Sequence, residues 1–151
     1  MNQVINMNTN LLLNSQKLKK IYAMLIKPIM QTYHVTQNEL DVLLFLVNNA
    51  PLDTAKDITE LRSLAKSQVC KSIESLSKRG FLSTEQDETD RRCIHLKVLP
   101  PAYPIVTHAQ QAQKTFLRSL YNGITQEEQQ MLEQIFHKIA QNVERMLEHG
   151  C

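Results

Sequence analysis

Two short segments with helical spacing, separated by about three residues, constrain the fold of this chain more than any other feature. The first follows Thr54, whose hydroxyl can cap a helix, and has Ile58 and Leu61 as its inward-facing positions. The second carries apolar residues at helical steps, at Val69, Ile73 and Leu76. Gly80 follows two cations and predicts the end of this second helix. Two helices joined by so short a turn are typical of a helix-turn-helix.

The periodicity changes after Gly80. Phe81 and Leu82 begin an extended segment, and residues 86–91 are wholly polar. Apolar and polar residues then alternate as in a half-buried strand, with Ile94, Leu96 and Val98 on the apolar side. This pattern predicts a hairpin with a charged tip, which is a wing. The predicted fold class is therefore mainly α (α+β): a winged helix-turn-helix with a two-stranded wing and flanking N- and C-terminal helices.

A long helix is predicted before the helix-turn-helix. Apolar residues recur at helical spacing from Leu11 to Tyr33, and Pro28 inside this segment should kink the helix or begin a second piece. The next helix has a capping box in which Thr36 is the cap and Glu39 reaches back to it. The flanking residues Val35 and Leu40 form a hydrophobic staple.

Two more helices are predicted after the wing. Pro100, Pro101 and Pro104 exclude regular helix until about Ile105, where a long helix begins that ends near Gly123. A second capping box, Thr125-Gln126-Glu127-Glu128, opens the last helix. Its apolar positions continue over about four turns, at Leu132, Ile135, Phe136, Ile139, Val143, Met146 and Leu147.

The outer helices carry more apolar surface than a winged helix needs for its own core. We expect the leftover faces to pack together and against a second copy of the chain, giving a two-fold homodimer. The alternative is that they only complete a monomeric bundle. The expected division is an N-terminal dimerisation helix (1–34), a winged helix-turn-helix DNA-binding domain (35–99) and C-terminal dimerisation helices (100–151).

A net charge of +2 conceals an uneven distribution along the chain. Residues 62–82 hold five basic residues against one acidic residue, whereas residues 120–151 hold two basic against five acidic residues. The basic middle segment favours a polyanionic partner, although a solvated helix face would have the same composition.

Several classes of protein are excluded by missing motifs. Three cysteines without a CxxC pair argue against a disulfide framework or zinc site, and the expected location is the cytoplasm. No apolar run has the length of a membrane helix, so no membrane partner is expected. The sequence has no nucleophile elbow, phosphate loop or HExxH, and three glycines are too few for a dinucleotide fingerprint. We therefore predict no enzyme activity, no catalytic residues, no metal and no cofactor.

Four short motifs in order resemble the MarR family of bacterial winged-helix transcription regulators. They are Val35-Thr36-x-x-Glu39-x-x-Val42-Leu43, Thr54-Ala55-x-Asp57-Ile58, Leu76-x-x-Arg79-Gly80-Phe81-Leu82 and Asp90-Arg91-Arg92. The resemblance covers about residues 11–147 and implies a DNA-binding transcriptional regulator, a repressor rather than an activator. The chain departs from the family where Ala65 replaces a capping Ser, and where Leu99-Pro100-Pro101 replaces the usual Leu-Thr-x-x-Gly.

The second helix of the motif is the predicted recognition helix. The residues at its start that lie off the apolar face are Ala65, Lys66, Ser67, Gln68 and Lys71. Gln68 can pair with adenine, and Lys66 or Lys71 can pair with guanine or phosphate, whereas Ser67 suits a phosphate. The alternative is a merely polar helix face.

The wing tip supplies the other predicted contacts to double-stranded DNA. Arg92 is expected in the minor groove, where negative potential attracts guanidinium groups, and Arg91 is expected on a phosphate. Asp90 has two interpretations: it holds Arg92 in a charge-assisted pair, or it fixes the hairpin turn.

A second hypothesis adds release by a small apolar or phenolic effector. The family resemblance implies a pocket between the dimer helices and the DNA-binding lobe. The candidates by position are Tyr22, Ile26, Tyr33, His34 and Phe45. Core packing is the competing interpretation for each of them.

Two further alternatives stay open at this point. Oxidation of Cys70 could disturb DNA contact, but Cys70 and Cys93 also suit the role of small packing residues. A winged helix that binds only other proteins is the alternative function, because such folds are reused.

Overall fold

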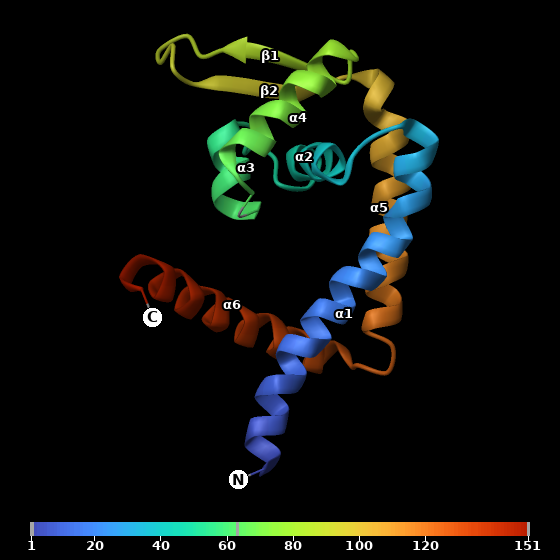
Figure 1. The fold of residues 1–151 in the computed structure, drawn as a ribbon, viewed down its shortest axis with the longest axis vertical. Helices are drawn as coiled ribbons and strands as arrows, with labels where there is room; N and C mark the ends of the chain where they lie inside the picture. The colour runs from blue at the N-terminus through green and yellow to red at the C-terminus, as the bar shows by residue number, and fades with distance from the viewer. Residues whose placement is uncertain (1, 63, 151) are drawn as a thin grey trace. The chain divides into compact units, whose positions relative to one another are not determined.

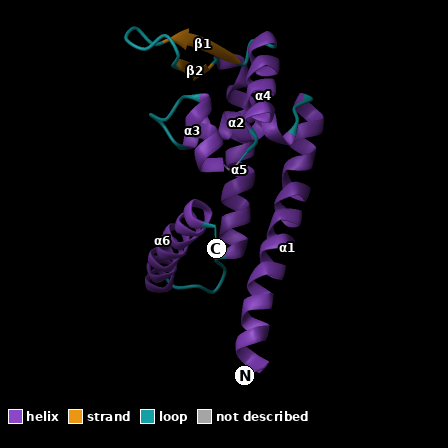
Figure 2. Ribbon diagram, turned by 60° about the vertical axis from the view of Figure 1, so that its left-hand side comes forward, coloured by secondary structure: helices purple, strands orange, loops and turns teal. Residues whose placement is uncertain are grey.

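The computed structural model describes residues 2–62 and 64–150, with side chains from residue 13 onward. It is mostly helical, with one two-stranded antiparallel sheet (Figures 1 and 2). The elements in order are α1 (Asn2–Tyr33), α2 (Gln37–Asn48), α3 (Ala55–Arg62), α4 (Lys66–Lys78), β1 (Leu82–Gln86), β2 (Ile94–Val98), the 3₁₀ turn η1 (Pro100–Ala102), α5 (Tyr103–Leu120) and α6 (Gln126–His149). This order confirms the winged helix-turn-helix with flanking helices.

The chain forms two compact units, residues 1–114 and residues 115–151. The first unit holds the winged helix together with α1 and the first two-thirds of α5, and the second holds α6. The boundaries expected from sequence, at 34/35 and 99/100, stay a prediction.

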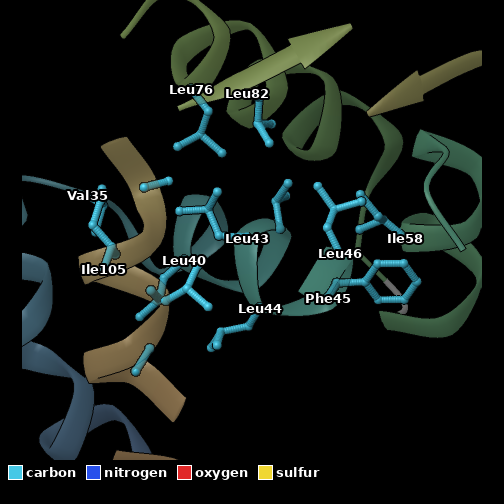
Figure 3. Close-up of a cluster of buried hydrophobic side chains, with 14 of the residues drawn as sticks. Val35, Leu40, Leu43, Leu44, Phe45, Leu46, Ile58, Leu76, Leu82 and Ile105 are labelled. Carbon is cyan, nitrogen blue, oxygen red and sulfur yellow. The ribbon is translucent and has the colours of Figure 1, made fainter. Parts of the chain in front are cut away.

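Helix α2 forms the centre of the core in the first unit. Its buried side chains meet residues from α3, α4, β1 and α5 in one cluster, which Figure 3 shows in close-up; the fully buried members include Leu40, Leu43, Leu44, Phe45, Ile58, Leu76 and Ile105. Each large apolar side chain that this cluster removes from water contributes roughly 1.5–3 kcal/mol to the stability of the motif.

Two expectations concern the end of α1 and the start of α2: one of the two alternatives for Pro28 is excluded, and the capping box forms only in part. Helix α1 runs without interruption through Pro28, so no second piece begins there. Thr36 caps α2 as predicted, accepting a hydrogen bond from the Glu39 backbone N–H at 3.1 Å. The Glu39 carboxylate does not return to the cap backbone. It accepts from the Thr36 hydroxyl and contacts Arg79 instead, so only half of the predicted capping box forms.

The helix-turn-helix itself is α3 and α4. Thr54 and Asp57 cap α3 reciprocally, each accepting from the other's backbone N–H. Ile58 is buried as predicted, but Leu61 is 60% exposed. The prediction for Leu61 was wrong because α3 has only eight residues and buries a single apolar position. Val69 and Leu76 bury the inner face of α4.

The wing is the β1–β2 hairpin, paired from Leu82↔Val98 to Gln86↔Ile94. Leu82 and Leu96 are buried, which anchors the base of the hairpin to the core. Ile94 is 49% exposed, contrary to the predicted alternation, because it lies at the far end of the hairpin, beyond the reach of the core.

The segment after the wing becomes helical sooner than expected. Pro100 and Pro101 lie in η1, and α5 begins at Tyr103 with Pro104 in its first turn. Proline is tolerated there because first-turn N–H groups have no intrahelical partner.

The second unit contains the predicted second capping box. Thr125 accepts from the Glu128 N–H at 3.2 Å, and the Glu128 carboxylate accepts from the Thr125 N–H at 2.9 Å. Helix α6 has no buried residue in the single chain, and most of its apolar positions lie exposed: Met131, Ile135, Phe136, Ile139, Val143, Met146 and Leu147.

Candidate nucleic-acid interface

The start of α4 is exposed and polar. Helix α4 begins at Lys66, and its cap residue Ala65 provides no side-chain hydrogen bond to the first turn. Ala65, Lys66, Ser67, Gln68 and Lys71 are all exposed, while the intervening Val69 is buried. The structure therefore brings the five predicted recognition residues together at one accessible helix start; their contacts with DNA remain predictions.

Lys56, in the first turn of α3, lies between the start of α4 and the wing. A hollow of about 310 Å³ is lined by Lys56, Lys66 and neighbouring α3 residues. A second hollow, of about 470 Å³, is lined by Lys56 together with Asp90 and Arg92 of the wing. Sequence reasoning missed Lys56 because the basic segment was counted from residue 62. Lys56 forms an ion pair with Glu60 at 3.9 Å, but both side chains are exposed, so the pair contributes little to stability.

The wing tip is organised by two aspartates. Asp87 Oδ2 accepts hydrogen bonds from the backbone N–H groups of Thr89 and Asp90 and from the Thr89 hydroxyl, at 2.7–3.0 Å. Asp90 Oδ1 accepts from the Arg92 backbone N–H at 3.0 Å. This is the turn-fixing role of Asp90; among the described ion pairs, none joins its carboxylate to the Arg92 guanidinium. The Arg91 and Arg92 side chains are exposed.

His95 on β2 lies between two carboxylates. Its Nδ1 is 2.7 Å from Asp53 Oδ1, in the loop before α3, and its Nε2 is 2.8 Å from Asp87 Oδ1. Hydrogen bonds to Asp53 and then Asp87 raise the pKa of His95 to about 9, and the bond to His95 holds the pKa of Asp87 well below its usual range. Sequence reasoning did not find this triad, because Asp53 lies 42 residues from His95.

Arg79 is a structural residue rather than part of the exposed basic surface. Its guanidinium donates to the carbonyls of Tyr33 and His34 at 2.8 and 2.7 Å, and it lies 3.4 Å from Glu39 and 4.8 Å from the Phe81 ring centroid. The charge count over residues 62–82 therefore overstated the charge available to a polyanion.

The five effector candidates do not share one environment. Ile26 and Phe45 are fully buried in the core, as the core-packing interpretation requires. Tyr22 is half-buried and accepts a hydrogen bond from Gln113 at 3.2 Å, and burial raises its pKa. Tyr33 hydrogen-bonds His108 on α5. His34 is exposed, with a φ of 53°.

The two described cysteines are free thiols. Cys70 is exposed on α4, and Cys93 is partly buried at the end of the wing loop. Desolvation, followed by the charges of Asp87 and Asp90, raises the pKa of Cys93, which lowers its thiolate fraction and hence its reactivity. Over residues 2–62 and 64–150, no cluster of His, Cys, Asp and Glu could hold a metal ion, and no helix is long and apolar enough to cross a membrane.

Two helices joined by a short turn, followed by a hairpin whose tip presents arginines, define a winged-helix protein. Residues 34–92 match the family model described as MarR family. The matched residues hold α2, α3, α4, β1 and the wing loop, so this part of the chain is similar to the MarR family.

A curated repressor is similar to part of this chain, and solved structures share its fold. The transcriptional repressor MprA of Escherichia coli K12 is 27% identical over 77 residues, which are 51% of this chain and 44% of the repressor. The chain thus spans less than half the length of that curated relative. A MarR protein from Peptoclostridium difficile has a TM-score of 0.75 at 18% identity, covering 90% of this chain and 88% of its own. Streptococcus pneumoniae FabT in complex with DNA has a TM-score of 0.66 at 18% identity, covering 97% of this chain and 99% of its own.

Proposed function

We propose that this chain is a sequence-specific double-stranded DNA-binding transcriptional regulator that acts as a homodimeric repressor on a pseudo-palindromic operator. The observation that carries the proposal is the juxtaposition of two exposed basic features, the start of α4 and the wing tip, on either side of the first turn of α3. DNA readers of this class use such a pair to engage a major groove and the adjacent minor groove.

Helix α4 supplies the sequence readout in this proposal. Gln68 offers an amide that can pair bidentately with adenine, and Lys66 and Lys71 reach guanine or phosphate. Ala65 and Ser67 let the backbone of the helix start approach the DNA closely, with the Ser67 hydroxyl on a phosphate. Lys56 adds a phosphate contact between α4 and the wing.

The wing supplies the minor-groove contact. Arg92 enters the groove and Arg91 contacts a phosphate. The Asp90 carboxylate supports this by fixing the backbone of Arg92 rather than by neutralising its side chain.

The apolar face of α6 supports the proposed dimer. Seven large apolar side chains on one helix lie exposed in the single chain, an arrangement that a second copy would bury. Two-fold pairing would place two α4 helices about 34 Å apart, one helical turn of DNA, which is the reason for a pseudo-palindromic operator.

Repression is favoured by the curated relative, which is named a transcriptional repressor. Release by a small apolar or phenolic effector is the finer part of the proposal. Tyr22, Tyr33 and His34 are its remaining candidate contacts, since Ile26 and Phe45 are core residues. A thermal-shift screen with phenolic and planar apolar compounds tests it: a compound that raises the melting temperature and releases DNA supports the effector, and no response across the panel contradicts it.

Selection of bound genomic fragments, followed by a mobility shift at low and high salt, tests the function itself. Recovery of fragments that share a two-fold symmetric sequence supports the proposal. Recovery of random fragments whose binding disappears at moderate salt would contradict sequence-specific binding. Recovery of no fragments at either salt concentration would favour a winged helix that binds only proteins.

A further inference from the structure

The His95 clamp, which we define as Asp53, His95 and Asp87, joins three separate parts of the first unit. Asp53 belongs to the loop before α3, His95 to β2 and Asp87 to the wing loop. The backbone strengthens the same connection, because the Leu96 N–H donates to the Asp53 carbonyl at 2.8 Å. The wing is therefore tied to the helix-turn-helix at a point beyond the buried base of the hairpin.

A continuous series of hydrogen bonds leads from the clamp to the wing tip. One carboxylate oxygen of Asp87 contacts His95, and the other accepts from Thr89 and from the Asp90 N–H. Asp90 in turn accepts from the Arg92 N–H, and the Asp90 carbonyl accepts from the Cys93 N–H. The steps after the His95–Asp87 contact fix backbone N–H groups, so a movement of Asp87 would displace the base of the Arg92 side chain.

The clamp needs a charged imidazole. Only the protonated ring has two N–H donors, one for each carboxylate; a neutral ring would turn one unprotonated nitrogen toward a carboxylate oxygen. Asp53 and Asp87 are the acids that act on the ring, and both favour a cation between them. Asp57 and Asp90 act on the neighbouring Cys93 thiol.

We infer that His95 is a positioning residue for DNA binding: its imidazolium holds the wing loop against the loop before α3 and thereby sets the position of Arg92 relative to α4. This inference rests on the proposed function. Loss of the proton releases one side of the clamp, so the wing tip becomes more mobile. Arg92 must then be ordered when DNA binds, and this ordering weakens the affinity.

The direction of the pH dependence follows from the raised pKa of His95, which is about 9 in the folded chain against an ordinary value of 6.5. The clamp contributes its full stabilisation below pH 6.5 and loses it as the pH rises through about 9. DNA affinity should therefore vary little between pH 6 and 8 and fall above that range.

The test combines NMR of the free protein with binding to the selected operator. Imidazole ¹⁵N signals of the full chain should show His95 protonated on both nitrogens at pH 7.5 and titrating near pH 9. The backbone amide signals of Arg91 and Arg92 should move with the same midpoint in the wild type and not in His95→Gln. Binding by His95→Gln should be about tenfold weaker, the equivalent of one charge-assisted hydrogen bond. His95→Lys, which restores a cation, should recover part of that loss.

Controls separate the possible failures. His137→Gln on α6 should change neither the wing amides nor the affinity. Asp87→Asn retains the histidine and should lower its pKa, which gives a second route if His95→Gln folds poorly. The inference would be overturned if the Arg91 and Arg92 amide signals did not change as His95 titrates. It would also be overturned if His95→Gln bound DNA with wild-type affinity. If the wild type binds no DNA at all, the proposed function fails, and the amide titration alone decides whether the clamp positions the wing.

Discussion

The guanidinium of Arg79, the residue that follows α4, donates a hydrogen bond to the carbonyl of Tyr33, the last residue of α1, at 2.8 Å. The same group donates to the carbonyl of His34 and pairs with the buried carboxylate of Glu39. The last carbonyls of a helix lack intrahelical partners and carry partial negative charge, so a cation placed there is stabilising. One side chain thus joins the end of α4 to the end of α1 and the start of α2.

Replacing Arg79 by Ala should lower the free energy of unfolding by about 2–3 kcal/mol, because charge-assisted hydrogen bonds are lost and Glu39 stays buried without its cation. Arg79→Lys should recover only part of the lost stability, because an ammonium group cannot reproduce the planar arrangement of guanidinium N–H donors. Urea unfolding followed by circular dichroism measures the free energy of unfolding of both variants. Lys78→Ala, next in the chain and exposed, is the control and should change stability by less than about 0.5 kcal/mol. An Arg79→Ala variant as stable as this control would refute the assignment.

His34 occupies the left-handed position that ends α1, with a φ of 53°. A residue with a Cβ is strained there, and glycine is the usual occupant. His34→Gly should raise the free energy of unfolding by up to about 1 kcal/mol, and His34→Val should lower it, as read from thermal melts. Destabilisation by glycine would show that the imidazole makes a contact that outweighs the strain.

Lys66 should contribute one phosphate contact. Lys66→Ala should reduce the slope of log affinity against log salt concentration by about 0.9, and should weaken binding to operator and random DNA similarly. Anisotropy titrations at several salt concentrations give the slope. The matched control is Lys138→Ala on α6, for which we expect no change. An unchanged slope in Lys66→Ala would mean that this lysine does not touch the backbone.

The apolar face of α6 should hold two copies together. Ile139→Asp places a charge within that face and should convert a dimer to a monomer in size-exclusion chromatography with light scattering. Gln134→Asp introduces the same residue on the polar face of α6 and should leave the dimer intact. A monomeric wild type, or a dimeric Ile139→Asp variant, would contradict the proposed assembly.

Local patterns were sufficient to predict most elements of this fold. Thr36, Thr54 and Thr125 cap their helices because each hydroxyl bonds a backbone N–H only a few residues away. The change from helical to alternating spacing after Gly80 located the wing correctly, since both periods are properties of short segments.

The errors arose where long-range contacts decide the outcome. Glu39 leaves its capping box because Arg79, 40 residues away, offers a stronger partner. The clamp on His95 was missed for the same reason, since a local pattern gives no indication that Asp53 and Asp87 approach one ring from opposite sides. Leu61 and Ile94 have the right spacing for burial, but their side chains stay 60% and 49% exposed in the single chain.

Fluorescence anisotropy with the selected operator tests the central claim most directly. The wild type, Arg92→Ala and Gln68→Ala are each titrated with the operator and with a scrambled duplex. We expect Arg92→Ala to lose about tenfold or more in affinity for the operator, and Gln68→Ala to lose discrimination between the two duplexes by about 1–3 kcal/mol. Wild-type affinity and discrimination in both variants would show that the start of α4 and the wing tip are not the surfaces that bind DNA.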